Sequence, residues 1–213
     1  LDEEVGGRIA LHEAAKNGRV SCLEILCETA ELDLLSTEGM AAVHLAAQNG
    51  HAECIELLVR HMANINIADL GANGFTACHH AIQNLQSRCV EVICHLGADL
   101  SVQDKKGRTP LQLCQLIVSK YSQGSDQEKE KVASIEKVVM WHENGRLLLR
   151  ACERGDYNET RQLLETDDFR RILYHDCEEI SPLKHVAKPA FLKNWIPRDT
   201  QEAFLAIVNA LTE

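Results

Sequence analysis

The chain has 213 residues with a formal net charge of −10 at pH 7, and 45% of them are hydrophobic but only 4% aromatic. No run of about 18 apolar residues occurs, which argues against a transmembrane helix. The 14 acidic and 5 basic side chains of residues 1–100 give that part a charge of −9, which disfavours nucleic acids and anionic membranes as partners because both require clustered Lys and Arg.

A pattern of six residues occurs four times along the chain, each time starting at Gly and ending at His or Gln. Its copies are spaced by 32, 35 and 33 residues: Gly7–His12, Gly39–His44, Gly74–His79 and Gly107–Gln112. The first two copies are followed by a pair of alanines and then by Asn-Gly, which predicts a turn because Gly tolerates left-handed backbone. Each copy therefore predicts a short helix that ends in a turn.

A second apolar segment follows each of the first three copies: Cys22–Leu26, Cys54–Leu58 and Cys89–Ile93. These segments predict a second helix in each unit. Thr109 and Pro110 suit the start of the fourth unit's first helix, as N-cap and first helical residue. The earlier units lack this pair, so we expect them to be less well capped. Because such a unit is too small to bury its own apolar face, the units must stack.

The repeated glycine, the His that ends each of the first three copies and the segment Gly97–Leu100 after the second helix together resemble the ankyrin repeat family. The resemblance covers about residues 5–118. It implies an all-α ankyrin-repeat solenoid of stacked helix-turn-helix units with β-hairpin or loop fingers. It also implies a concave, protein-binding face lined by fingers and first helices. The third finger is two residues longer than the others, around Asp69–Asn73.

We divide the chain into four segments. Residues 1–118 hold ankyrin repeats 1–4, ending with the first helix of repeat 4, and residues 119–131 are a polar insertion. A helix is expected over Gln127–His142. Residues 132–188 are degenerate ankyrin repeats, and they include a weak repeat in Asn144–Glu165. Residues 189–213 are a C-terminal capping helix or, alternatively, a fused peptide.

We predict no catalytic, metal or cofactor site. The sequence has no phosphate-binding glycine loop, no Gly-x-Ser-x-Gly and no zinc-protease His pair. The nine cysteines are interpreted as free thiols, and the equivalent Cys22, Cys54 and Cys89 are expected to form a buried column. His12, His44 and His79 form a second column, for which the family resemblance implies a structural hydrogen bond to backbone that links neighbouring units.

The predicted function is therefore a non-enzymatic protein–protein interaction module of the cytoplasm or nucleus. It would bind a partner peptide or domain in the concave groove, within a larger scaffold or regulator. The alternative is a regulatory ankyrin domain of a larger enzyme or channel. The acidic charge favours an extended peptide with basic and apolar residues. The predicted exposed apolar anchors are Met40, Leu45, Leu70 and Phe75, and the full predicted binding set is Met40, Leu45, Gln48, Asn49, Leu70, Asn73, Phe75, His80, Gln83, Asn84 and Arg108.

Asn66 is a candidate for modification. The resemblance places it at the finger position that the asparaginyl hydroxylase of metazoans modifies in ankyrin proteins, with Leu58 eight residues upstream. Repeat 3 has Ser101 at the equivalent position, so one site is expected. The alternative is an Asn that serves only as a turn residue.

Overall fold

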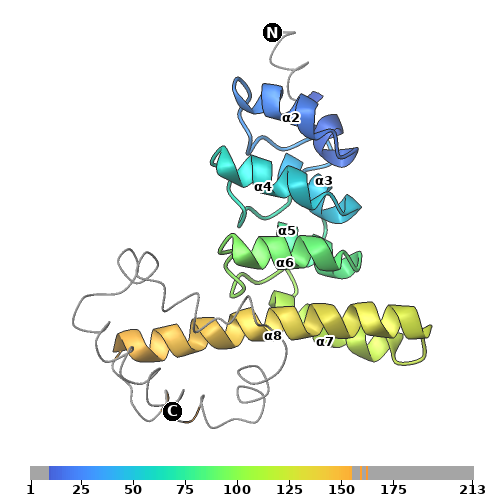
Figure 1. The fold of residues 1–213 in the computed structure, drawn as a ribbon, viewed down its shortest axis with the longest axis vertical. Helices are drawn as coiled ribbons and strands as arrows, with labels where there is room; N and C mark the ends of the chain where they lie inside the picture. Colours follow the sequence, from blue (N-terminus) through green and yellow to red (C-terminus); the bar gives the residue numbers. More distant parts are fainter. Residues whose placement is uncertain (1–9, 155–158, 160–161, 163–213) are drawn as a thin grey trace. The chain divides into compact units, whose positions relative to one another are not determined.

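The computed structural model describes residues 10–154, 159 and 162 (Figure 1). The chain divides into two compact units, residues 1–140 and 141–213. The predicted C-terminal helix of residues 189–213 and most of the predicted degenerate repeats lie outside the described residues. Among the helices of the described part, none has both the length and the apolar character needed to cross a bilayer.

The described residues form helices and loops without any strand, which confirms the predicted all-α fold class. A first helix covers residues 10–16. The helices that follow are α2 (Val20–Cys27), α3 (Ala42–Asn49), α4 (Ala52–Arg60), α5 (Ala77–Gln83), α6 (Ser87–His95), α7 (Pro110–Tyr121) and α8 (Asp126–Arg154).

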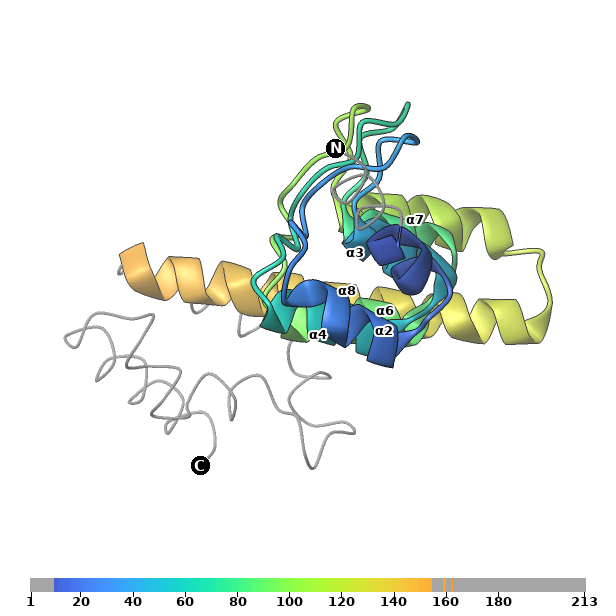
Figure 2. The ribbon, with the colours of Figure 1, turned by 90° about the horizontal axis from the view of Figure 1, so that it is seen from above.

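In the first unit the helices form two layers (Figure 2). The inner layer holds the helix of residues 10–16, α3, α5 and α7, and the outer layer holds α2, α4 and α6. Consecutive helices of a layer are neighbours: α3 packs on α5 and α5 on α7, while α2 packs on α4 and α4 on α6. Inner and outer helices of one repeat also pack together, as α3 does with α4. This arrangement is the stacked helix-turn-helix solenoid that the repeats predict.

Small side chains let the inner helices lie close together. Ala46, Ala47 and Ala81 are completely buried in α3 and α5. Ile55 and Leu58 are equally buried on α4, where the larger side chains fill the space between layers. Truncating such a buried Leu or Ile to Ala typically costs about 2–5 kcal/mol, because a cavity remains. The stack is therefore stabilised mainly by aliphatic packing between neighbouring repeats.

The histidine column caps the inner helices. The ring Nδ1 of His44 accepts a hydrogen bond from the backbone N–H of Ala41 (3.0 Å), and His79 makes the equivalent bond in α5. In α7 the Thr109 hydroxyl accepts from the backbone N–H of Gln112 (3.3 Å), whose amide oxygen accepts from the backbone N–H of Thr109 (3.0 Å). The poorer caps predicted for repeats 2 and 3 are thus compensated by His, which satisfies a helix-start N–H.

The same rings link each repeat to the next. The Nε2–H of His12 donates to the carbonyl of Leu34 (3.0 Å), and that of His44 donates to the carbonyl of Ile67 (2.8 Å). His79 donates in the same way to a carbonyl of repeat 4 (3.2 Å). Burial lowers the pKa of His44 to about 4, so this ring is neutral at pH 7. The structural role predicted for the column is confirmed.

The predicted burial of the cysteine column is wrong for its first residue, Cys22. Cys54 and Cys89 are buried, but Cys22 is exposed. One turn further along the outer helix, Ile25 is 71% exposed whereas the equivalent Leu57 is 5% exposed. The cause is position in the stack: α4 and α6 are each covered by the preceding outer helix, while α2 is the first outer helix among the described residues.

A short polar turn joins the two helices of the fourth pair. α7 continues to Tyr121, residues 122–125 form a tight turn, and α8 begins at Asp126, one residue before the predicted start at Gln127. Gly124 lies in this turn, where a residue of low helix propensity separates the two helices.

The length of α8 also differs from the prediction. It passes the expected end at His142 and continues to Arg154, through the start of the weak repeat expected at Asn144. Gly145 lies inside this helix, and an interior Gly costs only about 1 kcal/mol relative to Ala, which need not end a long helix. The described residues from 132 to 154 are therefore one helix and not a helix-turn-helix unit.

Candidate functional site

Within residues 10–154, three fingers connect the helix pairs and project on one side of the two layers (Figure 2). The second, third and fourth fingers turn at Ser36–Met40, Asp69–Phe75 and Asp104–Arg108. In each, the backbone N–H of the first residue donates to the carbonyl of the last, at 2.8, 2.9 and 2.9 Å. The two extra residues predicted in the third finger therefore lie at its tip, inside the same closing hydrogen bond.

Buried aspartates hold the third and fourth fingers. In the third, one carboxylate oxygen of Asp69 accepts from the backbone N–H of Phe75 (3.1 Å), and the other accepts from the Nε2–H of His80 (2.7 Å). In the fourth, Asp104 accepts from the backbone N–H of Arg108 (2.9 Å) and from its guanidinium Nε–H (2.7 Å). His80 and Arg108 were predicted to bind a partner, but in the structure both polar groups are engaged within their own repeats.

Three of the four predicted apolar anchors are buried rather than exposed. Met40, Leu45 and Phe75 are 9%, 5% and 3% exposed. The ring of Phe75 also lies edge-on to that of His80, with 5.4 Å between centroids. The finger glycine turns the next residue back toward the inner helices, so Phe75 joins the core. Leu70 at the third finger tip is 70% exposed and is the anchor that remains.

Two predicted amides also have a structural role. The side-chain N–H groups of Asn49 and Asn84, and of the equivalent Asn17, each donate at 2.8 Å to the carbonyl four residues earlier. The carbonyls of Glu13 and His80 also accept from the backbone N–H of Asn17 and Asn84 (3.0 and 3.1 Å), so each side-chain amide is a second donor near the end of its inner helix. The three side chains are exposed, but one amide hydrogen of each is already used.

Gln48 and Gln83 remain from the predicted inner-helix residues. Gln48 is half-buried, Gln83 is exposed, and neither side chain hydrogen-bonds to another described residue. The equivalent positions of the first and fourth inner helices hold Lys16, which is exposed, and Leu116, which is 50% exposed. We call these four residues the inner-helix face. The prediction omitted Leu116, which the 33-residue spacing from Gln83 would have identified.

The acidic charge does not lie on the inner-helix face. One equivalent position is Glu in each of the outer helices α2, α4 and α6: Glu24, Glu56 and Glu91. By contrast, α3 and α5 contain no Asp, Glu, Lys or Arg, and in the first inner helix Glu13 is balanced by Lys16. The charge of −9 on residues 1–100 therefore gives no support for a basic partner at this face.

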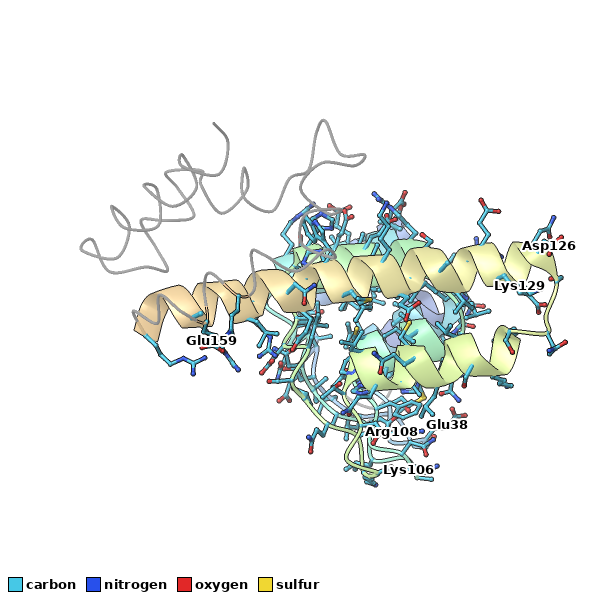
Figure 3. All side chains as sticks on the ribbon, turned by 90° about the horizontal axis from the view of Figure 1, so that it is seen from below. Glu38, Lys106, Arg108, Asp126, Lys129 and Glu159 are labelled. Atoms are coloured by element: carbon cyan, nitrogen blue, oxygen red, sulfur yellow. The ribbon has the colours of Figure 1, made fainter. Side chains whose placement is uncertain are left out.

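Charged groups of opposite sign do lie on the fingers. The residue before the finger glycine is Glu38, Asn73 and Lys106 in the second, third and fourth fingers. Figure 3 labels Glu38 and Lys106 on the side of the unit where the fingers project. Glu38 and Lys106 are exposed, and Asn73 is half-buried. We call Glu38, Leu70, Asn73 and Lys106 the finger strip.

Asn66, the predicted modification site, connects two repeats. Its side-chain oxygen accepts from the backbone N–H of Asp99 (2.8 Å), just as Asp33 accepts from the backbone N–H of Asn64 (2.8 Å) one repeat earlier. Asn66 is half-buried. The side chain therefore links two repeats through a hydrogen bond, in addition to any role in the turn.

The described residues offer little for catalysis or metal binding. No group of three His, Cys, Asp or Glu side chains that could hold a metal ion occurs among the residues that the structure describes. Burial raises the pKa of the Cys89 thiol to about 11 and that of Cys114 to about 12. These thiols remain protonated at neutral pH and are poor nucleophiles.

The sequence matches one known family in the region of these repeats. Residues 11–104 match the family model for ankyrin repeats, in three copies. The match extends from the first inner helix to the start of the fourth finger. No curated protein matches the sequence.

Proposed function

We propose, from the premise that residues 11–104 belong to the ankyrin repeat family, that this array is a non-enzymatic module that binds a peptide or domain of a partner protein. We place it within a larger scaffold or regulator of the cytoplasm or nucleus. The observation that carries the proposal is the inner-helix face: the side-chain amides of Gln48 and Gln83 have no hydrogen-bond partner among the described residues, and Leu116 is exposed in the same register.

Those residue types suit an extended peptide. A Gln side chain offers both a donor and an acceptor, which match the C=O and N–H of an extended backbone. Leu116 would remove apolar surface of the partner from water, and the full burial of such a side chain contributes about 1.5–3 kcal/mol. The inner helices are held by caps, His links and packed alanines, so little ordering is required when a partner binds.

A panel of random nonapeptides displayed on phage, selected on the whole chain, tests this proposal. The double variant Gln83→Ala/Leu116→Ala should weaken the selected peptides by about tenfold or more, since it removes an apolar anchor and a hydrogen-bonding group. The matched control is Ile25→Ala/Arg60→Ala on the outer helices, where both side chains are also exposed. Equal effects of the two double variants, or no selected peptide at all, would show that the inner-helix face is not a binding site.

A further inference from the structure

The fingers are connected to one another through their backbones. The N–H of Leu70 in the third finger donates to the carbonyl of Gly39 in the second (2.9 Å). The N–H of Lys105 in the fourth finger donates to the carbonyl of Asn73 in the third (2.7 Å), and its ammonium group donates to the carbonyl of Gly71 (2.5 Å). The inserted tip of the third finger is therefore held on both sides, and the finger strip is one continuous surface.

The charges of the finger strip change sign along the stack. Glu38 is exposed in the second finger and Lys106 is exposed in the fourth, at equivalent positions. Neither forms an ion pair with another described residue. The other cations of the fourth finger are engaged, because Arg108 pairs with Asp104 and the Lys105 ammonium group bonds to the third finger. An acidic end and a basic end thus flank the exposed side chain of Leu70.

The spacing of the strip matches a short extended segment. Packed neighbouring helices lie about 8–10 Å apart, so two repeats separate the second and fourth fingers by about 16–20 Å. An extended chain advances about 3.3 Å per residue, so this separation corresponds to about five or six residues. A partner could therefore place one charge at each end and an apolar side chain between them.

We infer that the finger strip binds an extended segment of a partner protein that carries a basic and an acidic residue on opposite sides of an apolar one. The basic residue lies at Glu38, the apolar residue at Leu70 and the acidic residue at Lys106. Because the two charges of the strip lie at opposite ends, the partner is selected by the order of its charges and not by its net charge. The inference rests on the proposed function and adds the chemistry of the partner to it.

Parallel selections of the displayed nonapeptides on three forms of the whole chain test the inference. The unaltered chain should enrich peptides with Lys or Arg on one side of an apolar residue and Asp or Glu on the other. Glu38→Lys should instead enrich peptides that are acidic on both sides. Glu24→Lys makes the same change at an exposed outer-helix position and should enrich the same peptides as the unaltered chain.

The selected peptides also give a measurable change in affinity. Glu38→Lys should weaken the peptides of mixed charge by about three- to tenfold, because an exposed ion pair is worth little and its reversal about twice as much. The difference should largely disappear at about 1 M salt, where the Debye length falls to about 3 Å. Thermal unfolding of both Lys variants checks that neither substitution alters the fold.

The outcomes separate the inference from the proposed function. Two results would overturn the inference and leave the proposed function standing. In both, the selected peptides bind Gln83→Ala/Leu116→Ala more weakly. In the first they show no charge order, and in the second they show the same charge order when they are selected on Glu38→Lys. A failure to select any peptide would overturn both.

Discussion

The inner helices of repeats 2 and 3 end after eight and seven residues, whereas α7 in the equivalent place has twelve. The difference arises at the residues that follow the apolar core of the helix. Gly50 and Leu85 adopt left-handed backbone with φ of 84° and 54° and reverse the chain. The equivalent residues of α7 include Val118, which is β-branched and disfavours that conformation. The helix therefore continues to the next polar turn.

The apolar face is not what distinguishes the two regions. Leu113 and Cys114 of α7 are buried like the equivalent Leu45 and Ala46 of α3, so α7 still stacks on α5. What differs is the termination signal, and with it the length of the outer partner: α8 has 29 residues against nine for α4 and α6. The comparison teaches that stacking is set by the buried positions, while a few turn residues decide whether a helix pair stays within the repeat length.

The largest effect is expected from Phe75→Ala in repeat 3. The structure places this ring in the core, so its removal should lower the free energy of unfolding by about 3–5 kcal/mol. Urea unfolding measures the change. Leu70→Ala in the same finger should change it by no more than about 0.5 kcal/mol, because that side chain is exposed. Similar losses for the two variants would contradict the placement of the finger residues.

The pH dependence of the free energy of unfolding should come from the histidines of repeats 1–3 and not from α7, because the equivalent residue of α7 is Gln112. The pKa of folded His44 is about 4 and that of an unfolded His about 6.5, so the unfolded chain takes up the proton first on acidification. The contribution of neutral His44 to the free energy of unfolding is fully present above about pH 6.5. It is lost as the pH falls toward 4, which lowers the free energy of unfolding by about 3 kcal/mol. Urea unfolding at several pH values measures this loss. His44→Gln, which copies Gln112, should flatten the dependence. An unchanged pH profile in that variant would contradict the assignment.

Limited proteolysis sharpens the comparison at the turn between α7 and α8. Within the described residues, the first cleavage should fall in residues 121–130, where Ser122, Gln123 and Ser125 are exposed at the end of the helix hairpin. A rate about tenfold above that within repeats 2 and 3 corresponds to about 1.4 kcal/mol less protection. Mass spectrometry of early fragments identifies the site. First cleavage within residues 40–60 would show that the repeats and not the turn open first.

Met62→Gly should stabilise repeat 2 by about 0.5–1 kcal/mol. Met62 has left-handed backbone with φ of 74° and an 87% exposed side chain, so Gly relieves strain and removes little packing. The gain is reduced by the greater freedom of Gly in the unfolded chain. Thermal unfolding measures it. The equivalent residue of repeat 3 is already Gly97, and a loss of stability in Met62→Gly would contradict the strain.

The smallest effect is expected from hydroxylation of Asn66. We propose that incubation with the asparaginyl hydroxylase adds one oxygen at this residue and none at Ser101. The folded stack should change little, because the side-chain oxygen that accepts from Asp99 is retained. Intact-mass measurement with Asn66→Ala as the control checks the site. An unmodified mass in the parent chain removes the proposal.

The sequence by itself determined the repeat period and the two helices of each repeat, while the His links were implied by the family resemblance. The period and the helices depend on local signals: Gly and Asn at turns, Thr-Pro at a helix start, and apolar residues at helical spacing. It also located the longer third finger, because an insertion changes the spacing between glycines without any reference to neighbours.

Only the tertiary structure decided which side chains of those elements meet water. Met40 and Phe75 are in register with Arg108, yet they are buried while Arg108 lies partly exposed on Asp104. Cys22 differs from the equivalent Cys54 only because no described outer helix covers α2. Burial is a property of what packs against a residue, and in a stacked array the neighbour that covers a position belongs to another repeat.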